Sequence, residues 1–456
     1  MTASLEGHKQ VHFVGIGGIG MSALAKILLA RGMTVSGSDQ SAGPQTETLA
    51  QLGARIHIGH GAEAIRGADL VIITPAAASA PDVAAARAAN IPVIRRAELL
   101  GAIMNPGRGI AVAGTHGKST TSALIAHILI EAGLDPTVII GAIANDIGSN
   151  ARIGAGPHVV VEADEFDAAF LELSPDIAII TSAEPEHLDF FGSSERMYEA
   201  FAQFADQVKD TLIICADDSP VDSVTEGATC SIVTYGTAAG DWRADQIDEG
   251  DGSTTFRAGL AGAERMYTMR LAGEHNVRNA LAALATAHEL GISADSAAQA
   301  LATFAGIRRR FERVGEANGV LVMDDYGHHP TEIRKTLGAM RRRFDRRILV
   351  IFQPHTFSRT KTFLKQFACA FADADRVYVL AVYGARESET LGVSAVDLAS
   401  AVSERHGSVA YTGTPEETVR RVLREVEPGD LVVTMGAGDV DLVGPLILDA
   451  IRERSI

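Results

Sequence analysis

Three times along the chain, a short run of apolar and β-branched residues ends in a glycine-containing turn and continues into a helical pattern. The three starts lie at residues 11–20, 109–117 and 320–328. Between them, short apolar segments alternate with longer helical ones, a pattern typical of stacked βαβ units with parallel sheets. The sequence therefore predicts the α/β fold class, with each start opening a sheet of its own.

The length of the chain requires more than one domain. It has 456 residues, whereas single domains usually have about 100 to 200. A turn cluster of Asn, Pro and Gly at 105–107 predicts the first linker. The arginine-rich segment 306–313 precedes a new strand and places a second boundary near residue 315. We therefore expect three domains, at residues 1–106, 107–315 and 316–456.

Charge and cysteine usage exclude several classes of protein. The net charge of −17 argues against nonspecific binding to nucleic acid or to an anionic membrane, since both favour clustered basic residues. The three cysteines lack the spacing of a metal site and fit a reducing compartment. Neither a signal peptide nor an apolar run of about 20 residues is evident. We expect a cytoplasmic protein without membrane insertion or nucleic-acid partner, either a monomer or a homodimer.

The first glycine turn, Gly15–Gly20, reads G-I-G-G-I-G between an expected strand at 11–14 and an expected helix at 21–30. Its backbone amides and the helix N-terminus can bind a diphosphate. Asp39 ends the next expected strand, 34–38, where a carboxylate can accept hydrogen bonds from ribose hydroxyls. The pattern predicts a nucleotide site. It would also suit a nicotinamide-dependent dehydrogenase, or a turn needed only for close packing.

The second glycine turn, Gly114–Thr120, reads G-T-H-G-K-S-T between an expected strand and an expected apolar helix. Its amides can hold phosphate oxygens, Lys118 can neutralise the β and γ phosphates, and the hydroxyl of Ser119 or Thr120 can bind Mg²⁺. Val112 stands where a standard phosphate loop has its first glycine. A dehydrogenase has no use for this loop, whereas a ligase that consumes ATP on a nucleotide-linked substrate needs both turns.

Carboxylates follow two further expected strands. The strand 159–161 runs into Glu162, and the strand 177–181 leads to a segment that contains His187 beside acidic residues. Ligands of open α/β sheets bind at the carboxyl ends of the strands. We therefore predict that Glu162 binds Mg²⁺ and that His187 contacts metal or phosphate.

With these motifs, the chain closely resembles the Mur ligases of peptidoglycan synthesis over nearly its whole length. The resemblance is carried by residues 12–22, 114–121, 162–165, 186–189, 275–280, 309–312, 324–330 and 353–355. It implies a Rossmann-like UDP-sugar domain, a central phosphate-loop ATPase domain, and a C-terminal Rossmann-like domain that closes over ATP and binds an amino acid. It is greatest to the subfamily that joins L-alanine to the lactyl carboxylate of UDP-N-acetylmuramate through an acyl phosphate, releasing ADP and phosphate.

The resemblance implies roles for individual residues. The contacts to the UDP part would be Gly15, Gly17, Gly18, Ile19, Gly20, Met21, Ser22 and Asp39. The contacts to ATP would be Gly114, Thr115, His116, Gly117, Lys118, Ser119, Thr120, His275, Asn279, Arg310 and Asp325. Lys118, Glu162 and His187 would be catalytic, and the Mg²⁺ ligands would be Ser119, Glu162 and His187. The alanine end would comprise Tyr326, His328, His355 and Arg359.

Some positions depart from the pattern of the family. Phe166 and Ser182 replace a common serine and a common asparagine, so neither is expected to be functional. Thr356 replaces a common arginine, which leaves Arg359 as the expected anchor of the alanine carboxylate. Other Mur ligases use a carbamylated lysine, but residues 197–208 contain none, in agreement with the alanine-adding subfamily.

Alternatives to this interpretation stay open. A recycling ligase that attaches a ready-made tripeptide to the same UDP-sugar would share the ATP machinery. A nicotinamide-dependent dehydrogenase would explain the first turn but not Lys118, and a nucleotide-binding module without turnover would share both turns. His328 and the next residue could also form a capped turn without a ligand.

Overall fold

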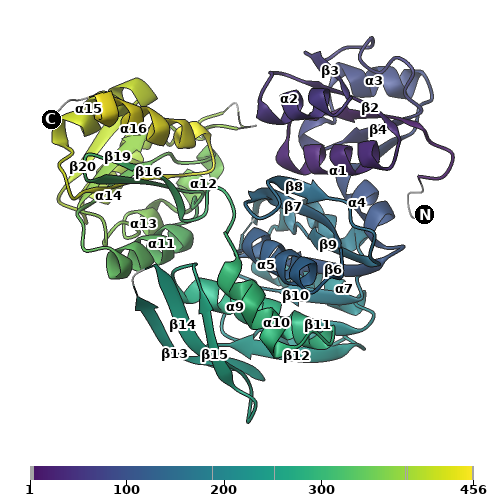
Figure 1. Ribbon diagram of the computed structural model, residues 1–456. Coiled ribbons are helices and arrows are strands. Elements are labelled where there is room, and N and C mark those ends of the chain that lie inside the picture. Colours follow the sequence, from purple (N-terminus) through teal and green to yellow (C-terminus); the bar gives the residue numbers. More distant parts are fainter. Residues whose placement is uncertain (1–4, 187, 251, 386, 388, 454–456) are drawn as a thin grey trace. The chain divides into compact units, whose positions relative to one another are not determined.

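The protein is described by a computed structural model that covers residues 5–186, 188–250, 252–385, 387 and 389–453 (Figure 1). The chain divides into two compact units. The first comprises residues 1–247, 256–269 and 276–305, and the second comprises 248–255, 270–275 and 306–456. The described strands form sheets of five, ten and six strands. In the part of the chain that the structure describes, no helix has the length and apolar character needed to cross a membrane.

The N-terminal sheet has the strand order β3-β2-β1-β4-β5, and all its pairs are parallel. Its strands are β1 Gln10–Val14, β2 Thr34–Asp39, β3 Arg55–Ile58, β4 Leu70–Ile73 and β5 Val93–Arg95. Its helices are α1 Ile19–Ala30, α2 Pro44–Gln51, α3 Pro81–Ala88 and α4 Arg96–Met104, with a 3₁₀ turn, η1, at Pro75–Ala77. The order reverses between β1 and β4, where open α/β sheets bind their ligands.

The central sheet has the order β15-β14-β13-β12-β11-β10-β6-β9-β7-β8. Its strands are β6 Arg108–Ala113, β7 Thr137–Ala144, β8 Ser149–Arg152, β9 His158–Glu162, β10 Ile177–Ile180, β11 Thr211–Cys215, β12 Ser231–Gly236, β13 Trp242–Gly250, β14 Ser253–Leu260 and β15 Arg265–Met269. The helical segments are α5 Lys118–Glu131, η2 Phe166–Glu172, α6 Leu188–Phe191, α7 Ser194–Asp206, α8 Val221–Thr225, α9 Glu274–Glu289 and α10 Ala294–Thr303. Strands β6, β9 and β10 are mutually parallel neighbours, so their carboxyl ends meet at one edge.

The C-terminal sheet has the order β16-β17-β21-β18-β19-β20, in which only the β16–β17 pair is antiparallel. Its strands are β16 Glu312–Ala317, β17 Val320–Asp325, β18 Ile348–Phe352, β19 Arg376–Leu380, β20 Val409–Gly413 and β21 Leu431–Met435. The helical segments are α11 Pro330–Arg343, α12 Phe357–Thr362, α13 Leu364–Phe367, α14 Ala395–Ser403, α15 Pro415–Glu425, η3 Asp439–Leu442 and α16 Val443–Glu453.

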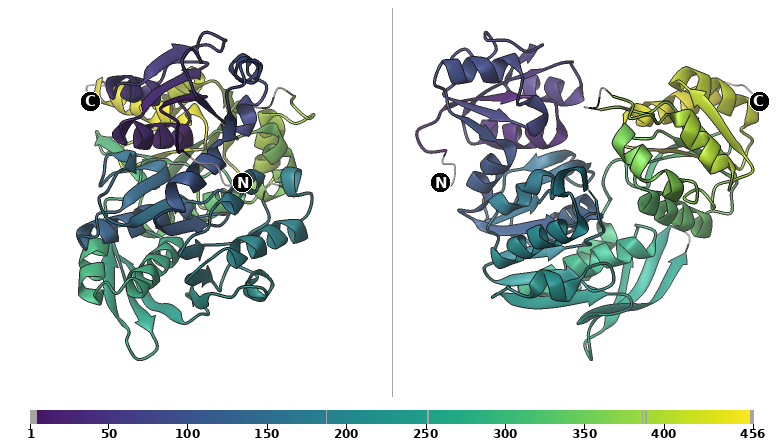
Figure 2. Two further views of the ribbon diagram at one scale, coloured as in Figure 1. Left: turned by 90° about the vertical axis from the view of Figure 1, so that its right-hand side faces the viewer. Right: turned by 180° about the vertical axis from the view of Figure 1, so that it is seen from behind.

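The C-terminal sheet is covered by helices on both faces (Figures 1 and 2). Alternate residues of β17 enter different cores, because side chains of a strand point to opposite faces. Leu321 and Met323 pack with α11 and α14, whereas Val320 and Val322 pack with α15 and α16. This doubly wound arrangement confirms the predicted α/β class. The predicted boundary near residue 315 lies inside β16, and the longest segment of the second compact unit begins at Gly306.

Candidate active site

The second glycine turn joins β6 to α5 and is shaped by two left-handed glycines. Gly114 has φ +121° and Gly117 has φ +82°, a region of the backbone that side chains disfavour. There is also no space for a side chain. A Cβ on Gly114 would collide with the hydroxyl of Thr181, and one on Gly117 would lie 2.5 Å from Oδ1 of Asn279. The turn therefore depends on glycine for both its conformation and its packing.

Lys118 is the first residue of α5, and its ammonium group is largely buried beneath the turn. Nζ donates hydrogen bonds to the carbonyl of Gly114 (2.6 Å) and to Oε2 of Glu165 (2.8 Å). Burial opposes the charge, but Glu165, Asp164 and Glu162 outweigh it and raise the pKa of Lys118 above its usual value. The lysine therefore stays charged where a phosphate could reach it.

Glu165 is the buried partner of this lysine, and only 1% of its surface is exposed. Burial raises its pKa to about 7, although the charge of Lys118 opposes this change. A carboxylate in so little water is costly unless it is paired. The carboxylate of Glu165 is therefore paired with the ammonium group of Lys118. A phosphate that binds at Lys118 would add negative charge beside this pair.

Ser119 and Glu162 present two oxygen ligands beside the same turn. Oγ of Ser119 donates a hydrogen bond to Oε2 of Glu162 (2.7 Å), and the backbone N of Gly141 donates to the same oxygen (2.8 Å). A hydroxyl and a carboxylate are the kinds of ligand that Mg²⁺ prefers. The pair thus fits the predicted metal, while the third predicted ligand, His187, lies outside the described residues.

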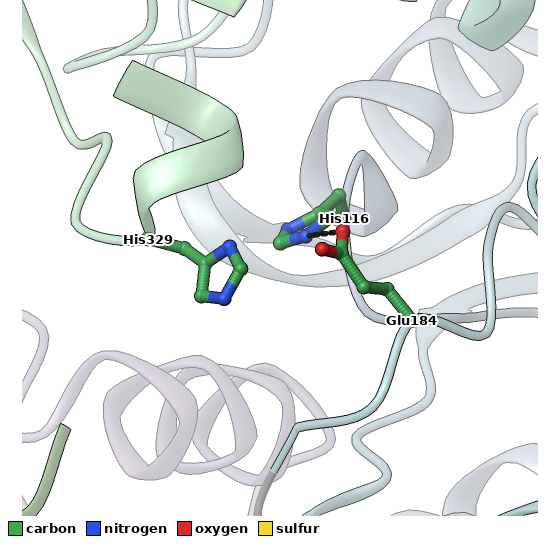
Figure 3. A group of neighbouring side chains, drawn as sticks. All are labelled: His116, Glu184 and His329. Atoms are coloured by element: carbon green, nitrogen blue, oxygen red, sulfur yellow. Dashed lines mark hydrogen bonds and ion pairs between the residues drawn. The ribbon is translucent and has the colours of Figure 1, made fainter. Parts of the chain in front are cut away.

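The segment after β10 holds the turn from its other side. Oγ of Ser182 accepts a hydrogen bond from the backbone N of His116 (3.0 Å), and the hydroxyl of Thr115 donates to the carbonyl of Glu184 (2.8 Å). Nε2 of His116 lies 3.0 Å from Oε2 of Glu184 (Figure 3). The conformation of the turn is therefore fixed by residues about 66 to 69 positions further along the chain.

Asn279, on α9, lies against the turn through its contact with Gly117 and is hydrogen-bonded to Oδ1 of Asn276 (3.0 Å). Thr120, in the first turn of α5, is buried as well. The predicted contact His275 belongs to the other compact unit. The structure therefore brings Asn279 to the phosphate end of the loop.

The first glycine turn, between β1 and α1, is tied to the end of β2. The backbone N of Gly17 donates to Oδ2 of Asp39 (2.8 Å), and a Cβ on Gly17 would lie 2.9 Å from that oxygen. Gly18 is the extended N-cap of α1. Met21 and Ser22 are buried, so their side chains face the protein. Contacts of this turn with UDP, including those of Gly15, Ile19 and Gly20, stay predictions.

The second compact unit gathers the residues predicted for the alanine end. The rings of His328 and His355 lie 5.9 Å apart, and those of Tyr326 and His328 lie 5.4 Å apart. Arg359 donates from Nη1 to Nδ1 of His355 (3.1 Å). Thr356 caps α12 at φ +64°, an unusual conformation for a β-branched residue.

Arg310 and Asp325 adjoin this group. The guanidinium of Arg310 lies 5.2 Å from the ring centre of Tyr326 and forms an ion pair with Glu332 (3.2 Å). Asp325 accepts hydrogen bonds from the backbone N of Phe311 and of Gly327, and burial raises its pKa. The unit therefore holds a cluster of cationic and aromatic groups suited to an anionic ligand.

Three family models match consecutive parts of the chain. Residues 10–108 match the model described as Mur ligase family, catalytic domain, residues 112–287 match the Mur ligase middle domain, and residues 309–438 match the Mur ligase glutamate ligase domain. The chain belongs to the Mur ligase family. As a Mur ligase, it is an ATP-dependent amide-bond ligase.

Similar proteins cover this Mur ligase from end to end. A UDP-N-acetylmuramate–L-alanine ligase of Anaeromyxobacter sp. is 43% identical over 446 residues, which is 96% of this chain and 97% of the relative. The crystal structure of UDP-N-acetylmuramate-alanine ligase from Thermotoga maritima gives a TM-score of 0.87 at 30% identity, over 98% and 100% of the two chains. A murein peptide ligase from Psychrobacter arcticus gives 0.76 at 26% identity, over 98% and 100%. The predicted family and fold are confirmed.

Two residues of the site were missed by reasoning from sequence. Glu165 belongs to the 162–165 motif, but only the fold shows that it pairs with Lys118. Ser182 was set aside because it departs from the pattern of the Mur ligases, yet its hydroxyl holds the backbone of the phosphate loop. For Ser182, its place two residues after the buried strand β10 was the available signal.

Proposed function

We propose that this Mur ligase joins L-alanine to the lactyl carboxylate of UDP-N-acetylmuramate and converts ATP to ADP and phosphate. The observation that carries the proposal is the phosphate loop with its charged, buried Lys118, in a chain whose first glycine turn is suited to a nucleotide. Relatives named UDP-N-acetylmuramate–L-alanine ligase, 42–43% identical over nearly the whole chain, support the choice of substrates.

The chemistry must turn a carboxylate into an electrophile. In the proposed reaction, an oxygen of the lactyl carboxylate attacks the γ-phosphorus of ATP, ADP leaves, and an acyl phosphate forms. The amine of L-alanine then attacks the acyl carbon, and the tetrahedral intermediate expels phosphate. Lys118 and the backbone amides of the turn stabilise the charge of the transferring phosphoryl group. No side chain is required as a nucleophile.

Ser119 and Glu162 would hold Mg²⁺, with His187 as the predicted third ligand. When bound, the ion would neutralise phosphate charge and orient the triphosphate. The hydroxyl and the carboxylate, which share a 2.7 Å hydrogen bond, are the right chemical types for this ion.

The amino acid would bind in the second unit. Arg359 can pair with the carboxylate of alanine through two parallel hydrogen bonds, which suits a site from which water is excluded. In that unit His355 is hydrogen-bonded to Arg359, and ring contacts link His355 to His328 and His328 to Tyr326. We further propose that residues 1–106, 107–315 and 316–456 serve the UDP-sugar, ATP and the amino acid in turn, in keeping with the three family matches.

Phosphate release with a panel of amines tests the proposal. The purified protein receives ATP, Mg²⁺ and UDP-N-acetylmuramate, with L-alanine, glycine, L-serine or the tripeptide L-alanyl-γ-D-glutamyl-meso-diaminopimelate. We expect the highest kcat/KM with L-alanine and weak turnover with glycine and serine, since a pocket discriminates against a missing methyl by only about 1 to 3 kcal/mol. A preference for the tripeptide would instead indicate the recycling reaction. Two structural neighbours, at 26% and 29% identity, are named as ligases of murein peptide or of this tripeptide.

We also propose a cytoplasmic location, because the reaction consumes ATP. Fractionation of cells that produce the tagged protein tests this, and recovery in an exported fraction would contradict it.

A further inference from the structure

Asn150, on β8, is fully buried, and its side chain reaches into the helix that follows the first glycine turn. Nδ2 donates to the carbonyl of Ile19 (2.6 Å) and to Oγ of Ser22 (3.1 Å), and Oδ1 accepts from Nζ of Lys26 (2.7 Å). Because a lysine only donates and a carbonyl only accepts, this network fixes the orientation of the amide. One side chain of the central sheet thus holds three groups of α1.

Two of the groups bonded to Asn150 lie at the N-terminus of α1, the end of the helix that is expected to face the diphosphate. Ile19 and Ser22 form the first turn of α1, directly after the N-cap Gly18. A helix N-terminus at the end of a glycine turn is where a diphosphate binds. Asn150 is 128 to 131 residues away in sequence from these two partners, so only the fold brings them together.

The hairpin that carries Asn150 also touches the phosphate loop. Strand β8 pairs with β7, with Ile139 opposite Ala151. In β7, the backbone N of Gly141 donates to Oε2 of Glu162, the oxygen that also accepts from Ser119. Helix α1 packs against both strands (Figure 1). The hairpin β7–β8 therefore contacts both the first turn of α1, through Asn150, and the carboxylate beside the phosphate loop, through Gly141.

We propose that Asn150 is a positioning residue that fixes the first turn of α1, and with it the UDP-sugar, relative to the phosphate loop. The inference rests on the proposed function, in which the turn before α1 binds the UDP part. Phosphoryl transfer needs the lactyl carboxylate in line with the γ-phosphorus, and a misplacement of about 1 Å can cost about 10²-fold in rate. Asn150 would act through α1 and would not touch the reacting atoms.

Asn150→Asp is the informative variant, and Lys26→Met is its matched control. The aspartate keeps the size of the side chain and an acceptor for Lys26 but loses the two N–H donors to Ile19 and Ser22. The methionine removes the bond to Oδ1, together with the longer bonds from Nζ to Oγ of Ser149 (3.3 Å) and Oε1 of Gln45 (3.5 Å), and leaves both N–H donors of Asn150 in place. We expect Asn150→Asp to raise the KM for UDP-N-acetylmuramate about tenfold and to lower kcat about tenfold. Lys26→Met should change either constant less than about threefold.

Binding of ADP separates positioning from general damage. In calorimetry, Asn150→Asp should bind ADP within about twofold of the native protein, because the phosphate loop itself is unchanged. If Asn150→Asp does not fold, Ser22→Ala removes the bond from Asn150 to Oγ of Ser22, together with the bond that this hydroxyl donates to the carbonyl of Ile19 (3.0 Å). It should raise the KM for the UDP-sugar by about threefold.

The outcomes distinguish this inference from the proposed function. If the native protein ligates L-alanine but Asn150→Asp keeps both constants within twofold, the positioning role is wrong and the function stands. An equal loss of ADP binding would also overturn it, because the residue would then support the whole unit. If the native protein releases no phosphate with UDP-N-acetylmuramate and any of the amines, the proposed function itself fails.

Discussion

The two glycine turns of the first compact unit have similar backbones but different buried polar side chains around them. Each follows a parallel strand, contains a left-handed glycine (φ +81° at Gly15 and +121° at Gly114) and opens a helix. Around the first turn, the buried polar groups Ser22 and Asn150 are neutral, whereas the second turn buries a charged lysine beside a carboxylate. Holding an unreactive diphosphate needs only amides and packing, whereas transferring a phosphoryl group needs a charge placed in advance.

His12 is a titratable group of the first sheet that burial keeps neutral. His12 is fully buried in β1, and its Nδ1 lies 2.9 Å from Oγ of Ser36. Burial lowers its pKa from 6.5 to about 4, although Asp82 opposes the change. The ring is therefore neutral at neutral pH, in contrast to Lys118.

The largest expected effect tests the charge of the second turn. Lys118→Ala should lower kcat/KM at least about 10³-fold, because a preorganised charge on the transferring phosphoryl group is lost. Binding of UDP-N-acetylmuramate, measured by calorimetry, should stay within about twofold. If turnover were near normal, the phosphate loop would have no part in the mechanism.

A matched pair of glycine variants compares the two backbones. Gly117→Ala places a Cβ in the left-handed region, which costs roughly 1 to 2 kcal/mol, and against Asn279. This variant should weaken the binding of ADP about a hundredfold. Gly17→Ala instead presses on Asp39 without left-handed strain, so it should raise the KM for the UDP-sugar about tenfold and spare ADP. If Gly117→Ala impaired only the UDP-sugar and Gly17→Ala impaired only ADP, the assignment of the two ligands to the two turns would be reversed.

Replacing Glu162 tests whether the second turn also holds metal. Glu162→Gln keeps the hydrogen bonds from Ser119 and Gly141 possible but removes a charged ligand. The Mg²⁺ concentration for half-maximal activity should rise about tenfold. The KM for the UDP-sugar at saturating Mg²⁺ is the control. An unchanged Mg²⁺ requirement would count against metal binding by this carboxylate.

The two glycine turns are expected to bind phosphate groups, whereas the carboxylate of the amino acid is expected to bind the guanidinium group of Arg359. Arg359→Lys retains the charge but not the two parallel donors, so the KM for L-alanine should rise about tenfold while those for ATP and the UDP-sugar stay within twofold. Initial rates with each substrate varied in turn provide the measurement. An effect confined to ATP would remove Arg359 from the amino-acid site.

The smallest effect on activity concerns the neutral histidine of the first sheet. The pKa of His12 is lower in the folded state, so its contribution to stability is complete above about pH 6.5 and is lost as the pH falls toward about 4. The loss is about 3 kcal/mol at most. Urea unfolding at pH 7 and 4.5 should therefore show a smaller acid destabilisation for His12→Asn than for the native protein. Equal pH dependence of the two proteins would show that the ring is not held neutral.

Local sequence determined the elements that carry the ligands. The strand expected at 11–14 corresponds to β1 Gln10–Val14, and the helix expected at 21–30 corresponds to α1 Ile19–Ala30. Such elements follow from hydrophobic periodicity and glycines within a few residues of one another. The antiparallel strand β16 was not expected, because its pairing with β17 is a property of the sheet rather than of the segment.

The sequence by itself determined the family, the three strand–turn–helix starts and the identity of Lys118, Ser119 and Glu162 as neighbours of a phosphate loop. Only the tertiary structure decided that Glu165 pairs with that lysine and that Asn150 holds the helix of the other turn. The physical reason is the sequence separation over which each kind of interaction acts. Backbone conformation and periodicity depend on residues a few positions apart, whereas a buried side chain finds partners 47 or 131 positions away, once packed sheets have excluded water.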